Sequence, residues 1–320
     1  MYYNSIRANI EKELTEAKSV ALSTDEWSSR VQESYLSIEI QFMNENCTLR
    51  RFTLCTEGLK DERPNAENLA LSLINTMESW NLREKTEAIL HDNARAIQLA
   101  GQLTEVPYNL NCAAHTLQLV VQDSLNSVKP YKSVLNKGSD IKLKLAAKAA
   151  INRRFDLDTP NLTAAHFASF YDPRFKNLDH ETPLMRNKII KAVKERMEAL
   201  SADSKENNKI NNEKENVSAL SFLFPNRKNS HDVISQLNSY INMLQIHHDS
   251  NPLEWWKNQK ERFPLVFQEA QKFLGIPATS ASSERTFSTA GQILRARRSA
   301  LKSENVNTLI FLAQNSHVET

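Results

Sequence analysis

Hydrophobic and polar positions alternate along residues 35–42, where the even positions are apolar and the odd ones are mostly polar, including Glu39. A period of two predicts a β-strand with one buried and one solvated face. Residues 49–56 repeat this pattern, and a polar turn at residues 44–46 joins the two stretches. The pair therefore predicts a β-hairpin.

Apolar residues three and four positions apart predict helices over residues 6–18, 66–80 and 94–103. Two short apolar runs, residues 19–25 and 86–92, each end in an aspartate and read as strands. The order is thus three strands, a helix, a strand and a helix. Because a helix separates the fourth strand from the others, that strand should run parallel to a neighbour. We predict an α/β (α+β) fold, a mixed sheet with helices packed on it.

The second half of the chain is predominantly helical. Residues 126–200 read as helices and loops interrupted by prolines, and residues 230–320 return to helical spacing. Between them, residues 201–217 are rich in Asn, Lys, Glu and Ser. Burial of these few apolar groups does not offset the conformational entropy that is lost on ordering. We therefore predict that this stretch is a disordered linker.

Composition mainly excludes classes of function. The five glycines are scattered along the 320 residues, which removes dinucleotide and P-loop phosphate cradles. No apolar run approaches a membrane span or a secretory signal, so we expect no membrane partner. The three cysteines fit a reducing compartment, and without any Cys-x-x-Cys pair we expect no zinc site. A net charge of +2 dictates no partner by itself.

Asp25 and Asp92 each stand at the carboxyl end of a predicted strand. In open α/β sheets ligands collect at such ends, and two carboxylates there suit Mg²⁺ with substrate phosphate. An aspartate after a strand is also a common helix N-cap, and Asp92 is well placed for that role. Spacing alone favours the N-cap.

Longer motifs bear on that choice, because they occur in the same order as in one known family. Together they closely resemble hAT-superfamily transposases, more specifically the zinc finger BED domain-containing type. The motifs are Leu22-Ser-Thr-Asp25-Glu-Trp27, Ala66-Glu-Asn-Leu69, His91-Asp92-Asn93-Ala94, Cys112-Ala-Ala-His115, Phe170-Tyr-Asp-Pro-Arg-Phe-Lys176, Pro252-Leu-Glu-Trp255-Trp256 and Ser282-Ser283-Glu284-Arg285-Thr286-Phe287.

The resemblance implies a ribonuclease-H-like core, interrupted by a helical insertion and closed by a C-terminal segment. In active members an Asp-Asp-Glu triad binds two metal ions, and its acids fall on Asp25, Asp92 and Glu284. Mg²⁺ or Mn²⁺ is the cofactor expected if this triad is competent. The family's Cys-x-x-His falls on Cys112 and His115, which we expect to support the site or simply to pack.

The chain also departs from the family pattern. The sequence contains no N-terminal BED finger, the insertion is short, and the Arg-Trp motif of the insertion is missing. We therefore expect a truncated or host-adopted copy rather than a working transposase. The domains implied are a first part of the core at 1–125, a remnant of the insertion at 126–200, the linker at 201–217, and a C-terminal dimerisation region at 218–320 that completes the core.

Basic and aromatic residues gather towards the C-terminus. Either the basic ones track phosphates or they form an ordinary solvated helix face; as DNA-binding candidates they are Arg285, Arg295, Arg297, Arg298 and Lys302. Aromatic and apolar residues there are typical interface anchors. With the resemblance they become the dimerisation candidates Trp255, Trp256, Phe263, Phe287, Leu309 and Leu312.

Two functions follow as expectations. The first is a nuclear, domesticated protein that forms a homodimer and associates with DNA or chromatin, without transposase activity and without a small-molecule substrate. The alternative is a metal-dependent DNA transposase or nuclease that uses the acidic triad.

Overall fold

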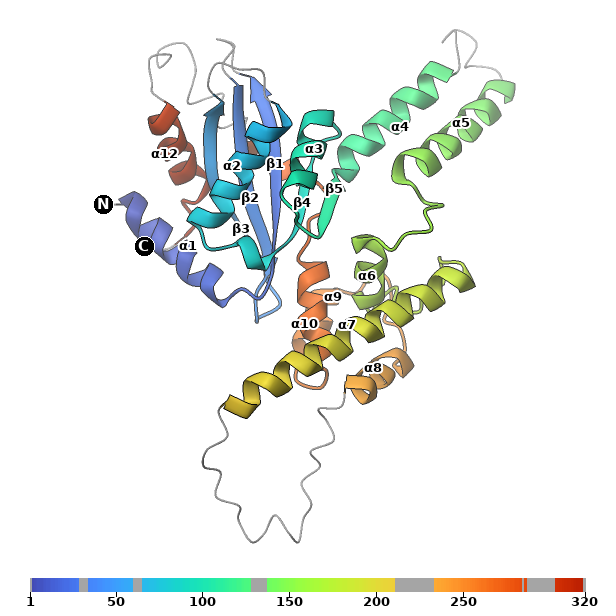
Figure 1. Cartoon of the computed structure of the whole chain (residues 1–320). Coiled ribbons are helices and arrows are strands. Elements are labelled where there is room, and N and C mark those ends of the chain that lie inside the picture. The colour runs from blue at the N-terminus through green and yellow to red at the C-terminus, as the bar shows by residue number, and fades with distance from the viewer. Residues whose placement is uncertain are drawn as a thin grey trace, which may run out of the picture. The chain divides into compact units, whose positions relative to one another are not determined.

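The computed structural model describes residues 2–28, 34–59, 65–127, 137–210, 233–283, 285–286 and 303–318 (Figure 1). Two compact units emerge. The core unit comprises Met1–Asn44, Leu49–Thr159 and Gly275–Thr320, and the helical unit comprises Glu45–Thr48 and Pro160–Leu274. The predicted boundaries at 125 and 218 differ from these, because the chain groups with the sheet as far as Thr159, whereas the C-terminal region groups with the insertion as far as Leu274.

A five-stranded mixed sheet in the order β3-β2-β1-β4-β5 forms the centre of the core unit. β1, β2 and β3 pair antiparallel, whereas β4 and β5 run parallel to β1. The strands are β1 (Val20–Ser28), β2 (Ser34–Met43), β3 (Leu49–Leu59), β4 (Thr86–His91) and β5 (Tyr108–Asn111). The mixed sheet and the parallel fourth strand are confirmed. β5 was not predicted, although its four residues, Tyr108-Asn-Leu-Asn111, do alternate between apolar and polar side chains.

The prediction of one solvated face for β2 is wrong. Nine of its ten residues are buried, and Ser37 and Glu39 on the polar side are 0% and 2% exposed. β2 lies inside the sheet, with a strand on either side. Helices cover one of its faces, and residues of the stretch that begins at Gly275, called the C-terminal segment below, cover the other. Gln41 shows the second cover, since its Nε2 donates to the backbone oxygen of Gly275 at 3.0 Å.

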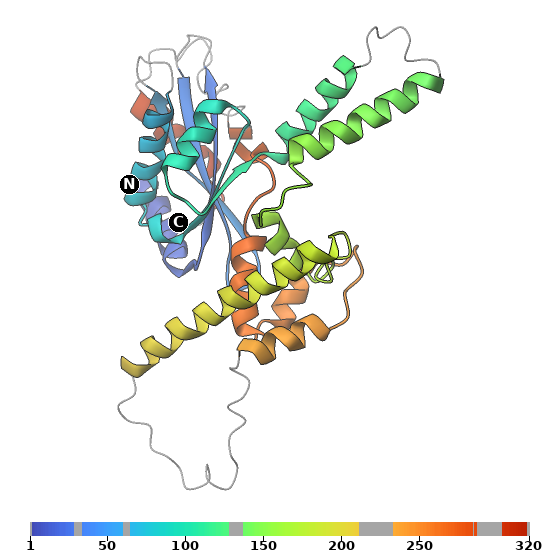
Figure 2. The same ribbon diagram turned by 45° about the vertical axis from the view of Figure 1, so that its right-hand side comes forward.

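One apolar cluster joins the sheet to four helices. Leu22, Ile38 and Ile89 contribute to it from three adjacent strands, and α2 and α3 lie across the same face (Figure 2). Asn65 caps α2 by accepting from the backbone of Asn68, which fixes where that helix begins. The helices are α1 (Tyr2–Glu16), α2 (Ala66–Ser79), α3 (Arg95–Leu103) and α12 (Ser303–Gln314), with a 3₁₀ turn η1 (Arg83–Lys85) before β4.

Two helices of the core unit, α4 (Ala113–Ser127) and α5 (Lys137–Phe155), lie side by side (Figure 1). The helical unit contains α6 (Ala164–Tyr171), α7 (Pro183–Ile210), α8 (Val233–Asn242), α9 (Pro252–Gln259) and α10 (Pro264–Leu274). α7 continues to Ile210, so residues 201–210 are helical instead of disordered; extending a helix that has already formed costs little per residue. Residues 211–217 of the predicted linker lie outside the described residues.

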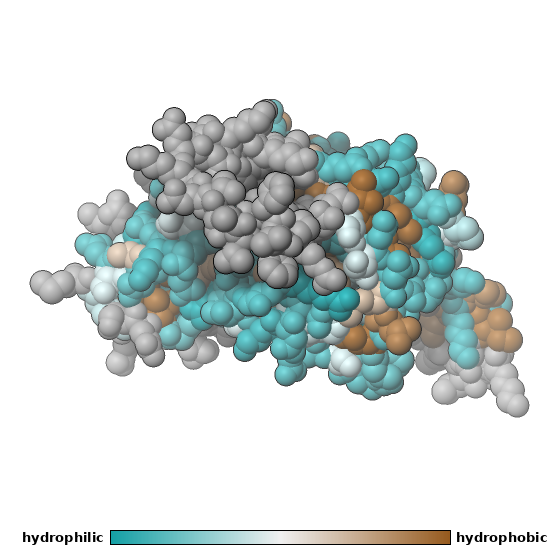
Figure 3. Space-filling model, turned by 90° about the horizontal axis from the view of Figure 1, so that it is seen from below, coloured by the Kyte–Doolittle hydropathy of each residue, from teal (hydrophilic) through white to brown (hydrophobic). Residues whose placement is uncertain are grey.

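The described helices include none with an apolar stretch long enough to cross a bilayer. Where residues are coloured by hydropathy, the face in Figure 3 shows mainly hydrophilic residues, with hydrophobic ones in small separate patches.

Candidate functional site

Asp25 and Asp92 are brought to the same edge of the sheet. β1 and β4 are parallel neighbours in which Ser23 pairs with Leu90. The pairing ends there; continued for two more residues, the same register would place Asp25 of β1 opposite Asp92, which directly follows β4. Both side chains are half-buried. The predicted adjacency of the two strands is confirmed. The prediction that Asp25 ends its strand is wrong, because pairing with β2 extends β1 to Ser28, whereas Asp92 does directly follow β4.

Each aspartate also makes a local hydrogen bond. Asp25 Oδ1 accepts from the backbone N–H of Glu26 at 2.9 Å, and Asp92 Oδ1 accepts from that of Ala94 at 2.9 Å. Ala94, not Asp92, occupies the N-cap position of α3. The N-cap interpretation of Asp92 is therefore wrong, although its carboxylate does stabilise the turn that leads into the helix.

A third acid, Glu26, lies close enough to Asp92 to be influenced by its charge. Partial burial of its carboxyl group and, second, the negative charge of Asp92 raise the pKa of Glu26, even though much of its side chain is exposed. Negative charge therefore accumulates at this edge. That is the electrostatic setting in which a divalent cation or a cationic partner is attracted.

Beneath the aspartates lies a buried polar network built on His91, which is 1% exposed. Its Nδ1 lies 2.5 Å from the backbone oxygen of Asp92, and its Nε2 lies 2.7 Å from Asn109 Oδ1. The Asn109 amide donates to the Gln98 backbone oxygen at 2.8 Å, which turns its own oxygen towards His91. Gly101 of α3 leaves room for this amide, since a Cβ there would lie 2.1 Å from Asn109 Oδ1.

Replacing Gly101 with alanine is expected to destabilise the core unit by about 1–2 kcal/mol, because the added methyl displaces Asn109 and overpacking outweighs the gain in helix propensity. Urea denaturation followed by circular dichroism measures the change. Introducing the same substitution into an Asn109→Ala background removes the colliding amide, so its cost should largely disappear there. Equal costs in both backgrounds would contradict this account of Gly101.

The Cys112 and His115 pair lies at the start of α4. Cys112 Sγ, fully buried, accepts from the backbone N–H of Ser280 at 3.4 Å, and Ala113 donates to the Ala278 backbone oxygen at 3.0 Å. These bonds join the start of α4 to the C-terminal segment, and His115 is half-buried on the first turn of α4.

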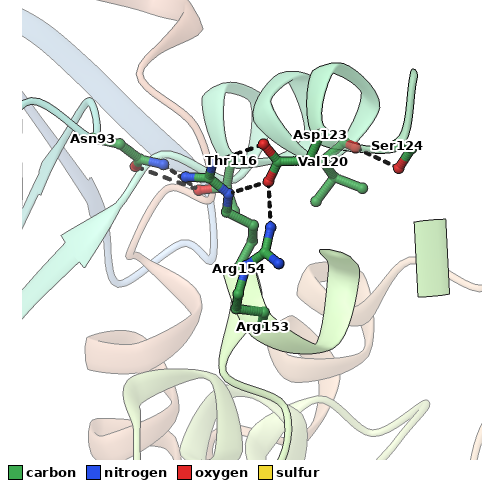
Figure 4. Close-up of polar contacts among 7 residues, drawn as sticks. All are labelled: Asn93, Thr116, Val120, Asp123, Ser124, Arg153 and Arg154. Carbon is green, nitrogen blue, oxygen red and sulfur yellow. Dashed lines mark hydrogen bonds and ion pairs between the residues drawn. The ribbon is translucent and has the colours of Figure 1, made fainter. Parts of the chain in front are cut away.

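α4 is tied down in two further places, both drawn in Figure 4. Asn93, which follows Asp92, donates to Thr116 Oγ1 at 3.1 Å. At the other end Asp123 accepts from Arg153 at 2.6 Å and from Arg154 at 2.9 Å. The Arg154 hydrogen bond is the largest of the contributions that lower the pKa of Asp123. The loop carrying Asp92 is therefore fastened to a helix that is itself braced by α5.

The C-terminal segment crosses the sheet face that carries Asp25. Ser283 Oγ lies 3.4 Å from Ser23 Oγ, and Thr286 Oγ1 donates to Glu39 Oε1 at 2.5 Å. Glu284 itself lies outside the described residues, as do the candidate residues Phe287, Arg295, Arg297, Arg298 and Lys302. Within the described residues no three acidic, histidine or cysteine side chains are grouped closely enough to hold a metal ion.

The dimerisation candidates separate into two groups. Trp256 and Phe263 are 0% and 1% exposed and pack with Tyr240 inside the helical unit, so they build its core and are not exposed to a partner. Trp255 is half-buried against the same cluster, and Leu312 is half-buried on the apolar cluster of the core unit. Leu309 is 36% exposed on α12. The sequence of a helical segment does not distinguish an aromatic side chain that packs in the core from one that contacts a partner.

Glu39 is a residue that sequence analysis missed. The strand pattern assigned it to solvent, yet it is buried beside Ser23 of β1 on the Asp25 side of the sheet. The available signal was residues 279–286, where small hydroxyl residues recur. Such residues can pack closely on a sheet while still bonding to a polar side chain.

Two family models match the chain. Residues 23–115 match the ZBED1 RNase-like domain, and residues 236–316 match the hAT family C-terminal dimerisation region. Over 95 residues, 30% of this chain, the sequence is 32% identical to a protein of Talaromyces stipitatus named "Putative transcriptional regulator tpeD". The chain spans about a tenth of the length of that relative. The first matched region contains Asp25, Asp92 and His91, and the second contains α9, α10 and α12.

Proposed function

Because the chain is a hAT-derived protein of the ZBED type, we propose that it acts in the nucleus as a domesticated homodimer that associates with DNA or chromatin and does not cut DNA. The observation that carries the proposal is the match of residues 236–316 to a dimerisation region. The name of the fungal relative, a transcriptional regulator, agrees with a role on DNA.

The dimer surface proposed here includes the outer side of α12. Val306, Ile310 and Phe311 are buried on the inner side of this helix, whereas Leu309 is exposed on the outer side. An exposed leucine within a dimerisation region is a natural anchor for the facing copy, because covering it removes apolar area from water.

DNA association is proposed to use the basic C-terminal residues. Arg285 is exposed, next to Thr286, which is bonded to the sheet. A guanidinium on a well-anchored segment suits a phosphate contact, which supplies affinity without reading sequence and weakens as salt rises.

A second candidate function, metal-dependent cleavage of DNA, is favoured by the parallel pairing of β1, which carries Asp25, with β4, which directly precedes Asp92. Two carboxylates with substrate phosphate are a usual way to hold Mg²⁺. The two aspartates fit that role in part, because one oxygen of each carboxylate already accepts a hydrogen bond from a local backbone N–H. The third ligand proposed, Glu284, lies outside the described residues. A bound Mg²⁺ would stabilise charge on the phosphate; the protein's share would be to hold the two carboxylates in place.

One experiment addresses both candidates. The mass of the purified chain in solution is measured for the wild type, for Leu309→Asp and for Leu184→Asp, an 81% exposed leucine of α7 that serves as the matched control. We expect a dimer for the wild type and the control, and a shift towards monomer of about tenfold or more in dissociation constant for Leu309→Asp, because a carboxylate is costly to bury.

The same samples are incubated with DNA over a titration of Mg²⁺ or Mn²⁺. Salt-sensitive binding without strand cleavage is the expected result. A monomeric wild type would overturn the dimer proposal. Metal-dependent cleavage that disappears in Asp25→Asn and Asp92→Asn would establish the second candidate instead.

A further inference from the structure

A hollow of about 410 Å³ opens beside the edge strand β3 in the core unit. Its walls come from β2, β3, the C-terminal segment and α12, and the residues that matter below are Glu39, Arg50, Arg51, Phe52 and Arg285. This volume is in the range of sites for small organic ligands. The hollow is not used by the dimerisation or the cleavage considered above, and it shares Arg285 with the proposed DNA contact.

The floor of the hollow carries a carboxylate that lacks a donor. Glu39 is 2% exposed, and Thr286 occupies its Oε1. Its Oε2 is buried and has no hydrogen-bond partner among the described residues. A buried carboxylate oxygen without a donor is costly, and such groups in native proteins call for an explanation. An N–H group brought by a ligand would satisfy it.

The walls carry the opposite charge. Arg51 donates to the amide oxygen of Gln41. Because that oxygen carries no net charge, this contact does not neutralise the guanidinium group. Arg50 is neutralised by the Glu13 carboxylate, at 2.6 and 2.7 Å, and its guanidinium lies 5.3 Å from the centre of the Phe52 ring. Arg285 is exposed at the hollow. The lining therefore combines one buried acceptor with guanidinium groups, whereas the Phe52 ring is buried in the apolar cluster.

We infer that this hollow binds a nucleoside phosphate, with N–H donors of the base directed to Glu39 and the phosphate directed to Arg51 and Arg285. A simple anion would leave Glu39 without a donor, and a simple cation would face the arginines. A nucleotide carries both chemistries in one molecule, and guanidinium groups bind phosphate strongly through paired N–H bonds. The nucleotide has two sources, a free nucleotide or the phosphorylated end of a DNA strand.

The test measures binding of deoxyguanosine monophosphate to the full chain by calorimetry, against deoxyguanosine and inorganic phosphate. We expect the nucleotide to bind about tenfold more tightly or better than either comparison ligand, since each lacks one of the two contacts. A short single strand with a 5′-phosphorylated guanosine separates the two sources. Tighter binding of the strand assigns the site to DNA ends, and tighter binding of the nucleotide assigns it to a free ligand.

Variants locate the binding. Arg285→Ala and Glu39→Gln should each weaken nucleotide binding about tenfold, whereas Arg262→Ala, an exposed arginine of the helical unit, should leave it unchanged. Arg285 is exposed, so that variant keeps the inference testable even if Glu39→Gln fails to fold, which a thermal melt reveals. Nucleotide binding no tighter than inorganic phosphate, or unaffected by Arg285→Ala, would overturn the inference. Loss of the dimer with nucleotide binding retained would overturn only the proposed function.

Discussion

Replacing Trp256 with alanine is expected to destabilise the helical unit by about 4 kcal/mol. The side chain is fully buried, and its ring stacks on Tyr240 with the two ring centroids 5.5 Å apart. The ring centroid of Phe267 lies 5.7 Å from that of Trp256. Its Nε1 donates to the Tyr171 backbone oxygen at 2.9 Å. Truncation therefore leaves a large cavity and a buried carbonyl without its donor.

Chemical denaturation, together with hydrogen exchange of α8 and α9, measures this loss. The neighbouring substitution Trp255→Ala is the matched control, since Trp255 is only half-buried, and it should cost clearly less. A variant that keeps wild-type stability but becomes monomeric would contradict the assignment of Trp256 to the core and return it to the dimer interface.

Replacing Lys176 with methionine is expected to cost about 3 kcal/mol of stability in the same unit. Lys176 is 5% exposed, and its ammonium group donates to the backbone oxygens of Tyr240, Ile241 and Met243 at the end of α8. The last carbonyls of a helix have no partner within that helix, so this lysine supplies them. Burial lowers the pKa of Lys176, which shows that holding the charge there has a cost that the three carbonyls offset.

Methionine fills similar space without that desolvation cost, yet it leaves three carbonyls unsatisfied, so the net effect is destabilising. Lys188→Met is the control, because Lys188 is exposed and donates to the single backbone oxygen of Pro160. It should change stability by less than about 0.5 kcal/mol. Protection of α8 against hydrogen exchange measures both variants, and equal protection would show that Lys176 does not cap the helix.

The local sequence determined the elements of the core unit. Alternation along residues 35–42 placed β2, three- and four-residue spacing placed α2, and the helix between the third and fourth strands required β4 to run parallel to a neighbour. Side-chain period and connection length are properties of a short stretch of chain, so they could be predicted before any contact was known. The pairing of β4 with β1, the strand that carries Asp25, agrees with that topology.

Burial of the polar side chains was decided only by the tertiary structure. Glu39 is buried because Thr286, far away in sequence, lies over β2. Trp256 and Phe263 are core residues because α6 and α8 bring Tyr171 and Tyr240 to them. Whether an apolar or charged side chain faces solvent, a partner or its own chain depends on long-range contacts. No local pattern carries that information, because the same periodicity serves all three environments.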